Sequence, residues 1–142
     1  MAQRILHLAD ELAARVLQAA SRAYPNECCG LIEGDDTPDG WRALAVHDAK
    51  NIADDPRRRF LIDPQAQFDL MRRLRGADTR IIGCFHSHPD GEAKPSAADR
   101  AEAYETDFLY LIAGGGPEMF TLKAYLFTGA TGFSPVTISS DD

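Results

Sequence analysis

The stretch Ile81-Ile82-Gly83-Cys84-Phe85-His86-Ser87-His88-Pro89 is followed, after residues 90–95, by Ser96-Ala97-Ala98-Asp99. Its apolar, β-branched first half predicts a buried strand that Pro89 ends. Alternate side chains of a strand share a face, so His86 and His88 point one way and Ser87 the other. Residues 90–94 form a polar loop, and a helix is predicted over residues 96–103. Asp99 is then on the first helical turn, which the loop can fold back against the end of the strand.

These side chains can form a metal site. Two imidazole nitrogens and a carboxylate, from His86, His88 and Asp99, suit Zn²⁺ and leave a fourth tetrahedral position open for water. Three other interpretations remain open. Ser96 and Asp99 also match a helix capping box, and two histidines on one strand face could be a pH-sensitive surface patch. Cys84 could share the face of His86 and complete a Cys-x-His-x-His set, although a deeper strand position is more often core.

The pattern His86-x-His88-x7-Ser96-x2-Asp99 resembles the signature of the JAMM metallopeptidases, also called MPN+ or Mov34/PAD-1-like, which include deubiquitinases and bacterial stand-alone peptidases. That family also has an upstream glutamate in a Pro-x-Glu-x-Cys-Gly setting, which Pro25-Asn26-Glu27-Cys28-Cys29-Gly30 matches. The resemblance extends through Asn51 and Arg59-Phe60-Leu61-Ile62-Asp63-Pro64, so that it covers most of the chain.

The resemblance implies a zinc metallopeptidase with one Zn²⁺ per chain, bound by His86, His88 and Asp99. It further implies that Glu27 is the general base and that Ser96 donates a hydrogen bond to the developing oxyanion. Taken alone, Glu27 would be an ordinary exposed residue in a turn between a helix and a strand. The implied reaction is hydrolysis of a peptide or isopeptide bond after the C-terminal Gly-Gly of a ubiquitin-like or sulfur-carrier protein, for example to release cysteine. The short chain favours a small carrier or a peptide tail, bound extended along a sheet edge near the zinc.

Three rival functions are weighed against this one. A metal-free MPN scaffold would be a protein-interaction module, but such domains typically lack a motif residue and this chain has them all. A zinc deaminase needs His-x-Glu followed by Pro-Cys-x-x-Cys, and this cysteine pair does not occur in the chain. RadC-like DNA-repair relatives share a similar metal motif, yet the formal net charge of −7 gives no support for nucleic-acid binding.

The composition is typical of one water-soluble domain. A chain of 142 residues suits a single domain over residues 1–142, and 44% hydrophobic with 26% charged residues is ordinary for such a domain. No apolar run approaches the roughly 20 residues of a membrane span, and acidic residues follow the first eight positions closely, which argues against a signal peptide. We therefore expect a cytoplasmic protein whose three cysteines, Cys28, Cys29 and Cys84, are reduced and buried.

The rest of the chain predicts an α/β (α+β) fold with a central mixed sheet flanked by helices, which agrees with the cytidine-deaminase-like architecture that the resemblance implies. A helix is expected over residues 10–24, and a second begins at Asp63-Pro64, ends near Gly76 and turns Phe68, Met71 and Leu74 to the core. Residues 34–40 and 114–117 are expected to be turns, and His47 a surface residue. The other strands are expected over residues 28–32, 41–46, 59–62, 108–113, 119–127 and 133–138.

Overall fold

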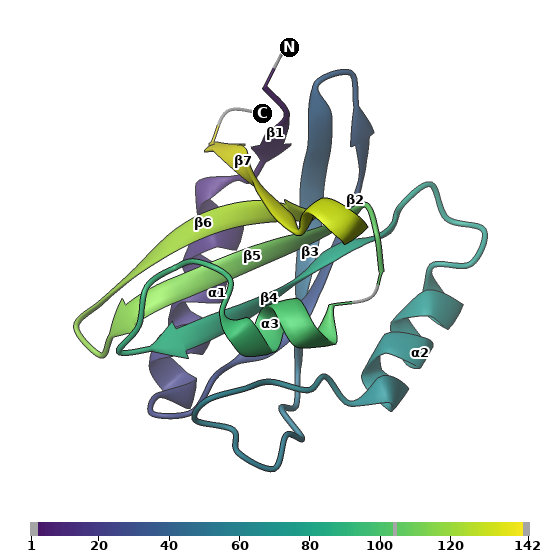
Figure 1. Ribbon diagram of the computed structural model, residues 1–142. Coiled ribbons are helices and arrows are strands. Elements are labelled where there is room, and N and C mark those ends of the chain that lie inside the picture. Colours follow the sequence, from purple (N-terminus) through teal and green to yellow (C-terminus); the bar gives the residue numbers. More distant parts are fainter. Residues whose placement is uncertain (1–2, 104, 141–142) are drawn as a thin grey trace.

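A mixed β-sheet organises the computed structural model, which describes residues 3–103 and 105–140 (Figure 1). Helix α1 lies against one face of the sheet, and α3 lies on the opposite side of the strands. In chain order the elements are β1 (Ile5–His7), α1 (Asp10–Ala23), β2 (Cys29–Thr37), β3 (Gly40–Ala49), α2 (Pro64–Arg73), β4 (Arg80–Pro89), α3 (Ala97–Glu102), β5 (Phe108–Gly116), β6 (Met119–Phe127), the 3-10 turn Gly129–Thr131 and β7 (Phe133–Ser139).

The strands close into a barrel in the order β1-β3-β2-β4-β5-β6-β7. The pairs β4–β5, β1–β3 and β1–β7 are parallel and the others are antiparallel, so the predicted mixed sheet is confirmed. Strand β1 has only three residues, which is too short to show a period of two in the sequence. It nevertheless closes the sheet, because it pairs with β3 on one side and with β7 on the other.

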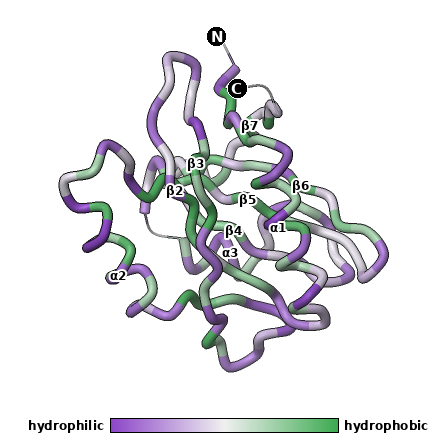
Figure 2. Tube along the Cα trace, turned by 180° about the vertical axis from the view of Figure 1, so that it is seen from behind, coloured by the Kyte–Doolittle hydropathy of each residue, from purple (hydrophilic) through white to green (hydrophobic). Residues whose placement is uncertain are grey.

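Two apolar clusters lie on the two faces of the sheet. The larger joins α1, through Val16 and Ala20, to strand residues that include Ile32, Trp41 and Phe85. The smaller contains Leu31, Leu70, Cys84, Phe108, Tyr110 and Phe127. Hydrophobic residues accordingly follow the central strands, whereas the loops are mainly hydrophilic (Figure 2). Cys28, Cys29 and Cys84 are free and buried, as expected. Within the described residues, no helix is both long and apolar enough to span a membrane.

The predicted core face of α2 is confirmed at Leu74 but wrong at Phe68 and Met71. Asp63 caps the helix and Pro64 opens it, as predicted, but Phe68 and Met71 are 53% and 56% exposed. The buried residue is Leu70, and Leu74 packs partly against the same cluster. A short helix at the side of the sheet can bury only a narrow line of residues four apart, and Leu70 and Leu74 occupy that line.

Three local predictions are also corrected. The predicted strand over residues 59–62 is reduced to one bridge between Asn51 and Ile62, because the Asn51 side chain bonds backbone groups that a partner strand would use. Residues 34–40 form no long loop, since β2 and β3 run on as a hairpin. Residues 114–116 are no turn, because β5 continues through them. His47, which was expected at the surface, is only partly exposed, and its Nε2 atom lies 2.9 Å from Glu33 Oε1.

Candidate metal centre

The end of β4 and the start of α3 bring three potential ligand atoms together. The Nε2 atoms of His86 and His88 lie 3.0 Å apart, and each lies 3.1 Å from Asp99 Oδ2. Two ligands of a tetrahedral Zn²⁺, each about 2.0 Å from the ion, are separated by about 3.3 Å. The triangle of atoms therefore matches one face of such a tetrahedron to within a few tenths of an ångström, and the donor set suits a zinc ion.

A backbone carbonyl fixes the orientation of the His88 ring. His88 Nδ1 lies 2.9 Å from the carbonyl oxygen of Glu92. Since a carbonyl can only accept, Nδ1 carries a proton and the lone pair of the neutral ring is on Nε2, inside the triangle. His86 is held differently. Its ring is fully buried and stacks on Phe60, with centroids 4.2 Å apart and planes at 19°.

Asp99 has two roles, so the capping interpretation and the metal interpretation are compatible. Ser96 Oγ accepts a hydrogen bond from Asp99 N at 3.0 Å, and Asp99 Oδ2 accepts one from Ser96 N at 2.9 Å, which together form a capping box. The same Oδ2 atom faces both histidines. Burial alone would raise the pKa of Asp99, but hydrogen bonds with His86 and His88 outweigh it and hold this pKa well below its ordinary value.

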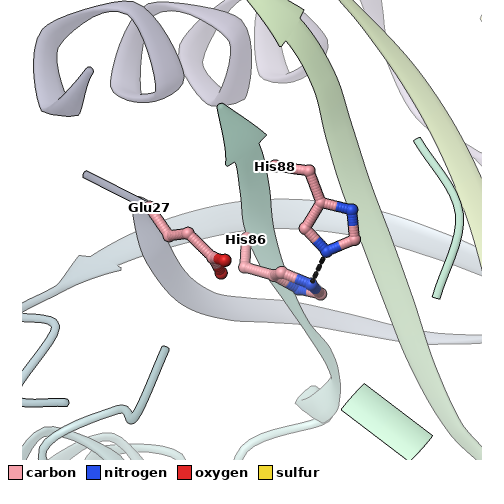
Figure 3. Close-up of side chains that lie close together, drawn as sticks. All are labelled: Glu27, His86 and His88. Carbon is pink, nitrogen blue, oxygen red and sulfur yellow. Dashed lines mark hydrogen bonds between the residues drawn. The ribbon is translucent and has the colours of Figure 1, made fainter. Parts of the chain in front are cut away.

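Glu27 lies at the rim of the triangle, where β2 begins. Figure 3 shows its carboxylate directed toward His86 and His88, and one ligand atom from each of these three residues lies within 4.8 Å of the others. Glu27 is 5% exposed, so it is not the ordinary exposed residue that its local sequence alone would suggest. Among the described residues its buried Oε1 atom has no hydrogen-bond partner. Burial raises the pKa of Glu27 to about 8, which gives the carboxylate a high affinity for protons at neutral pH.

Two polar side chains hold the Glu27 segment in place, and reasoning from the sequence missed the role of both. Asn51 Nδ2 donates to the Glu27 carbonyl and to the Arg59 carbonyl, each at 3.1 Å. The fully buried Ser87 accepts a hydrogen bond from Cys28 N at 2.8 Å. The alternation of strand side chains correctly turned Ser87 away from the histidines. That Ser87 bonds Cys28 N could not be predicted from the sequence, because it depends on the β2–β4 register that places Cys29 opposite His86.

An apolar cavity of about 240 Å³ opens beside Asp99. Its walls include Phe60, Leu61 and Tyr110, and Glu102 and Glu105 supply its charged groups. Cys84 also lines this cavity and belongs to the smaller apolar cluster. The structure therefore places Cys84 in the core.

Comparison with known proteins agrees with this geometry. A family model described as prokaryotic homologs of the JAB domain matches residues 9–126. The chain belongs to this family. Its resemblance to the JAMM metallopeptidases is thereby confirmed.

Named relatives and solved structures support the assignment. A protein of Haloferax volcanii named desampylase is 31% identical over 84% of this chain and 83% of its own length. The CysO-cysteine peptidase of Mycobacterium tuberculosis is 28% identical over 94% of this chain and 91% of its own. A protein of Desulfitobacterium hafniense, solved in solution, superposes with a TM-score of 0.84 at 30% identity, covering 94% of this chain and 91% of that one. A Salinibacter ruber protein gives a TM-score of 0.71 at 28% identity, over 98% and 92% of the two chains.

Proposed function

We propose that this protein is a zinc metallopeptidase that hydrolyses the peptide or isopeptide bond after the C-terminal Gly-Gly of a ubiquitin-like or sulfur-carrier protein. The observation that carries the proposal is the triangle formed by His86 Nε2, His88 Nε2 and Asp99 Oδ2, with the buried Glu27 at its rim, whose Oε1 atom has no hydrogen-bond partner among the described residues. The family and the names of the two relatives, a desampylase and a CysO-cysteine peptidase, support the substrate class.

The proposed metal is one Zn²⁺ per chain, with His86, His88 and Asp99 as ligands. Bound there, Zn²⁺ would polarise the scissile carbonyl and lower the pKa of a water molecule from 15.7 to about 7. Three protein ligands leave the fourth position open, as in other catalytic zinc sites. The three ligand atoms already stand at suitable separations, so the ion requires little rearrangement of the chain.

Glu27 takes a proton from the attacking water and passes it to the leaving amine. A general base works best when its pKa lies near the working pH, and burial moves the pKa of Glu27 into that range. Its Oε1 atom, which has no partner among the residues described, supplies the acceptor, while the hydrogen bond from Asn51 to the Glu27 carbonyl keeps the segment in place.

Ser96 donates a hydrogen bond to the oxyanion that develops on the scissile carbonyl. Its Oγ atom accepts from Asp99 N, and a hydroxyl that accepts one bond still has its own O–H to donate. The capping role and the catalytic role therefore use different capacities of the same group. Donors of this kind contribute about 2.7–4 kcal/mol to transition-state stabilisation.

The carrier tail lies in the apolar cavity beside Asp99. We expected the tail to bind along a sheet edge near the zinc. It cannot add to β4 as a further strand, because β4 already pairs with β2 on one side and with β5 on the other. The half-exposed Leu61 and the ring of Phe60 offer an apolar surface that leads toward the ligand triangle. This position would leave the bond after Gly-Gly next to Glu27 and Ser96.

The test is mass spectrometry of ubiquitin-like and sulfur-carrier proteins, each extended past Gly-Gly by cysteine or by a peptide. We expect zinc-loaded wild type to cleave at least one of them after Gly-Gly. Glu27→Ala should keep zinc but lose turnover, whereas His88→Ala should lose both. An active Glu27→Ala protein would remove the proposed base. Near-zero zinc by elemental analysis of the wild type, with no cleavage, would favour a metal-free interaction module instead.

A further inference from the structure

We infer that Tyr125 is a positioning residue for the metal centre: it holds the loop between β4 and α3 so that the Glu92 carbonyl fixes the tautomer of His88. This inference rests on the proposed function, because it concerns the lone pair that His88 offers to the metal. Tyr125 lies on β6, and its hydroxyl bonds the loop rather than a proposed ligand, so it acts through the loop.

The contact runs through two consecutive loop residues. The Tyr125 hydroxyl donates to the Ala93 carbonyl at 2.7 Å. The preceding carbonyl, that of Glu92, lies 2.9 Å from His88 Nδ1. Because neighbouring peptide planes share a Cα atom, a shift of the Ala93 carbonyl also moves the Glu92 carbonyl. Tyr125 thus secures the acceptor that keeps the proton on Nδ1.

Gly114 on β5 lets the loop between β4 and α3 pack closely against the sheet. It pairs with His88 in the parallel β4–β5 register, and β5 continues through it. A Cβ atom built on Gly114 would lie 2.5 Å from the Glu92 carbonyl carbon and 2.7 Å from Ala93 Cα. No side chain fits there unless the loop moves away. Glycine therefore lets the loop lie directly on the strand, next to His88.

The opposite end of the loop is also anchored. The Tyr24 hydroxyl donates to Asp90 Oδ2 at 2.8 Å, and Asp90 N donates to the Gly115 carbonyl at 2.6 Å. Tyr24 precedes the Glu27 segment in the chain, so this bond ties the loop to the part of the molecule that carries the proposed base. With Tyr125 at Ala93 and Tyr24 at Asp90, the segment that contains Glu92 is fixed on both sides.

The expected effect of removing one anchor follows from the tautomer. Without a firmly placed Glu92 carbonyl, either nitrogen of His88 can carry the proton, and the form with a free Nε2 lone pair becomes less populated. Loss of a partner that orients a metal-bound histidine typically lowers metal affinity by about 10–100-fold. Tyr125 bonds Ala93 rather than Glu92, the residue that orients His88. We therefore expect Tyr125→Phe to weaken zinc binding by about 10-fold, at the low end of that range.

The experiment compares wild type with Tyr125→Phe, Gly114→Ala and the control Thr37→Val. Thr37 donates a hydrogen bond of 2.8 Å to Asp39 in the hairpin between β2 and β3, so the control removes a similar bond away from the loop. Zinc affinity is measured by competition with a chelator. Long-range ¹H–¹⁵N spectra of the metal-free proteins, at a mildly alkaline pH where imidazole is neutral, report which nitrogen of His88 carries the proton.

Wild type and Thr37→Val should show the Nδ1–H form of His88 and equal zinc affinities. Tyr125→Phe should show a mixture of tautomers and the weaker affinity, and Gly114→Ala a larger loss, in proteins whose amide spectra remain dispersed. The inference is overturned if Tyr125→Phe keeps both the wild-type tautomer and the wild-type affinity. A wild type that binds no zinc would instead refute the proposed function, so the two failures are distinguishable.

Discussion

Replacing Glu27 by glutamine should stabilise the metal-free protein in a pH-dependent manner, although it should abolish turnover. Glu27 is buried, and within the part of the chain that the structure describes its Oε1 atom lacks a hydrogen-bond partner. Glutamine has nearly the same shape but never ionises, so the variant avoids the cost of a buried negative charge. A residue kept for catalysis at the expense of stability should behave in this way.

The magnitude follows from the raised pKa. Burial raises the pKa of Glu27 from 4.5 to about 8. The folded state therefore binds more protons than the unfolded state between these values, and its stability falls as the pH rises through that window. A pKa of about 8 against 4.5 corresponds to a loss of about 3 kcal/mol at pH 7 and about 5 kcal/mol well above pH 8, relative to acid pH.

The assay is urea unfolding of the chelator-treated proteins from about pH 5 to pH 9, the window that spans both pKa values. We expect the free energy of unfolding of Glu27→Gln to exceed that of wild type by an amount that grows with pH and then levels off. The variant–wild-type difference removes the contributions of titratable groups far from Glu27, whereas His88, which interacts with the Glu27 charge, differs between the two proteins. Glu118→Gln, an exposed carboxyl change between β5 and β6, is the control and should show no such trend. A difference between Glu27→Gln and wild type that stays constant with pH would refute the reasoning.

Three further predictions concern the surroundings of the site. Ser96→Ala should cost about 0.5–2 kcal/mol of stability through the lost cap and lower kcat by about 10²–10³-fold, as measured by urea unfolding and steady-state kinetics. Asn51→Ala should leave the Glu27 and Arg59 carbonyls without their donor and cost about 1–3 kcal/mol, with faster amide hydrogen exchange at Cys28 as the local readout. Phe60→Ala removes the ring stacked on His86, so zinc affinity measured by chelator competition should fall, whereas the conservative Phe60→Tyr should retain it.

The sequence predicted which side chains come together at the candidate metal site better than it predicted the surroundings of that site. The periods of strand and helix were enough to place His86, His88 and Asp99 at one end of β4, because each position depends only on its own element. The capping box could also be predicted, since it spans just four residues. The resemblance then brought Glu27 to the same place from a distant segment, which no local period could do.

The remaining features depended on contacts between distant segments. Strand β1 forms only because β3 and β7 lie on either side of it. The glycines after Ala113 suggested a turn, yet they extend β5 because they pair with the start of β6, and Gly114 leaves room for the loop at Glu92. On α2 the spacing of apolar residues predicted that Phe68, Met71 and Leu74 face the core, but the helix buries Leu70 against the smaller apolar cluster. At β1 and α2 the deciding interaction joins segments that are far apart in the chain.

The ligand triangle also shows how a metal and a proton compete for one place. Burial would lower the pKa of His88, but hydrogen bonds with Asp99 and the Glu92 carbonyl outweigh it and raise this pKa. When His88 is protonated, the proton on Nε2 points at Asp99 Oδ2, 3.1 Å away. A zinc ion bound through the same nitrogen would have to displace that proton, because metal binding requires the neutral imidazole. Zinc affinity should accordingly increase with pH until His88 is neutral, and the loop at Glu92 contributes both to the proton-bound and to the metal-bound arrangement.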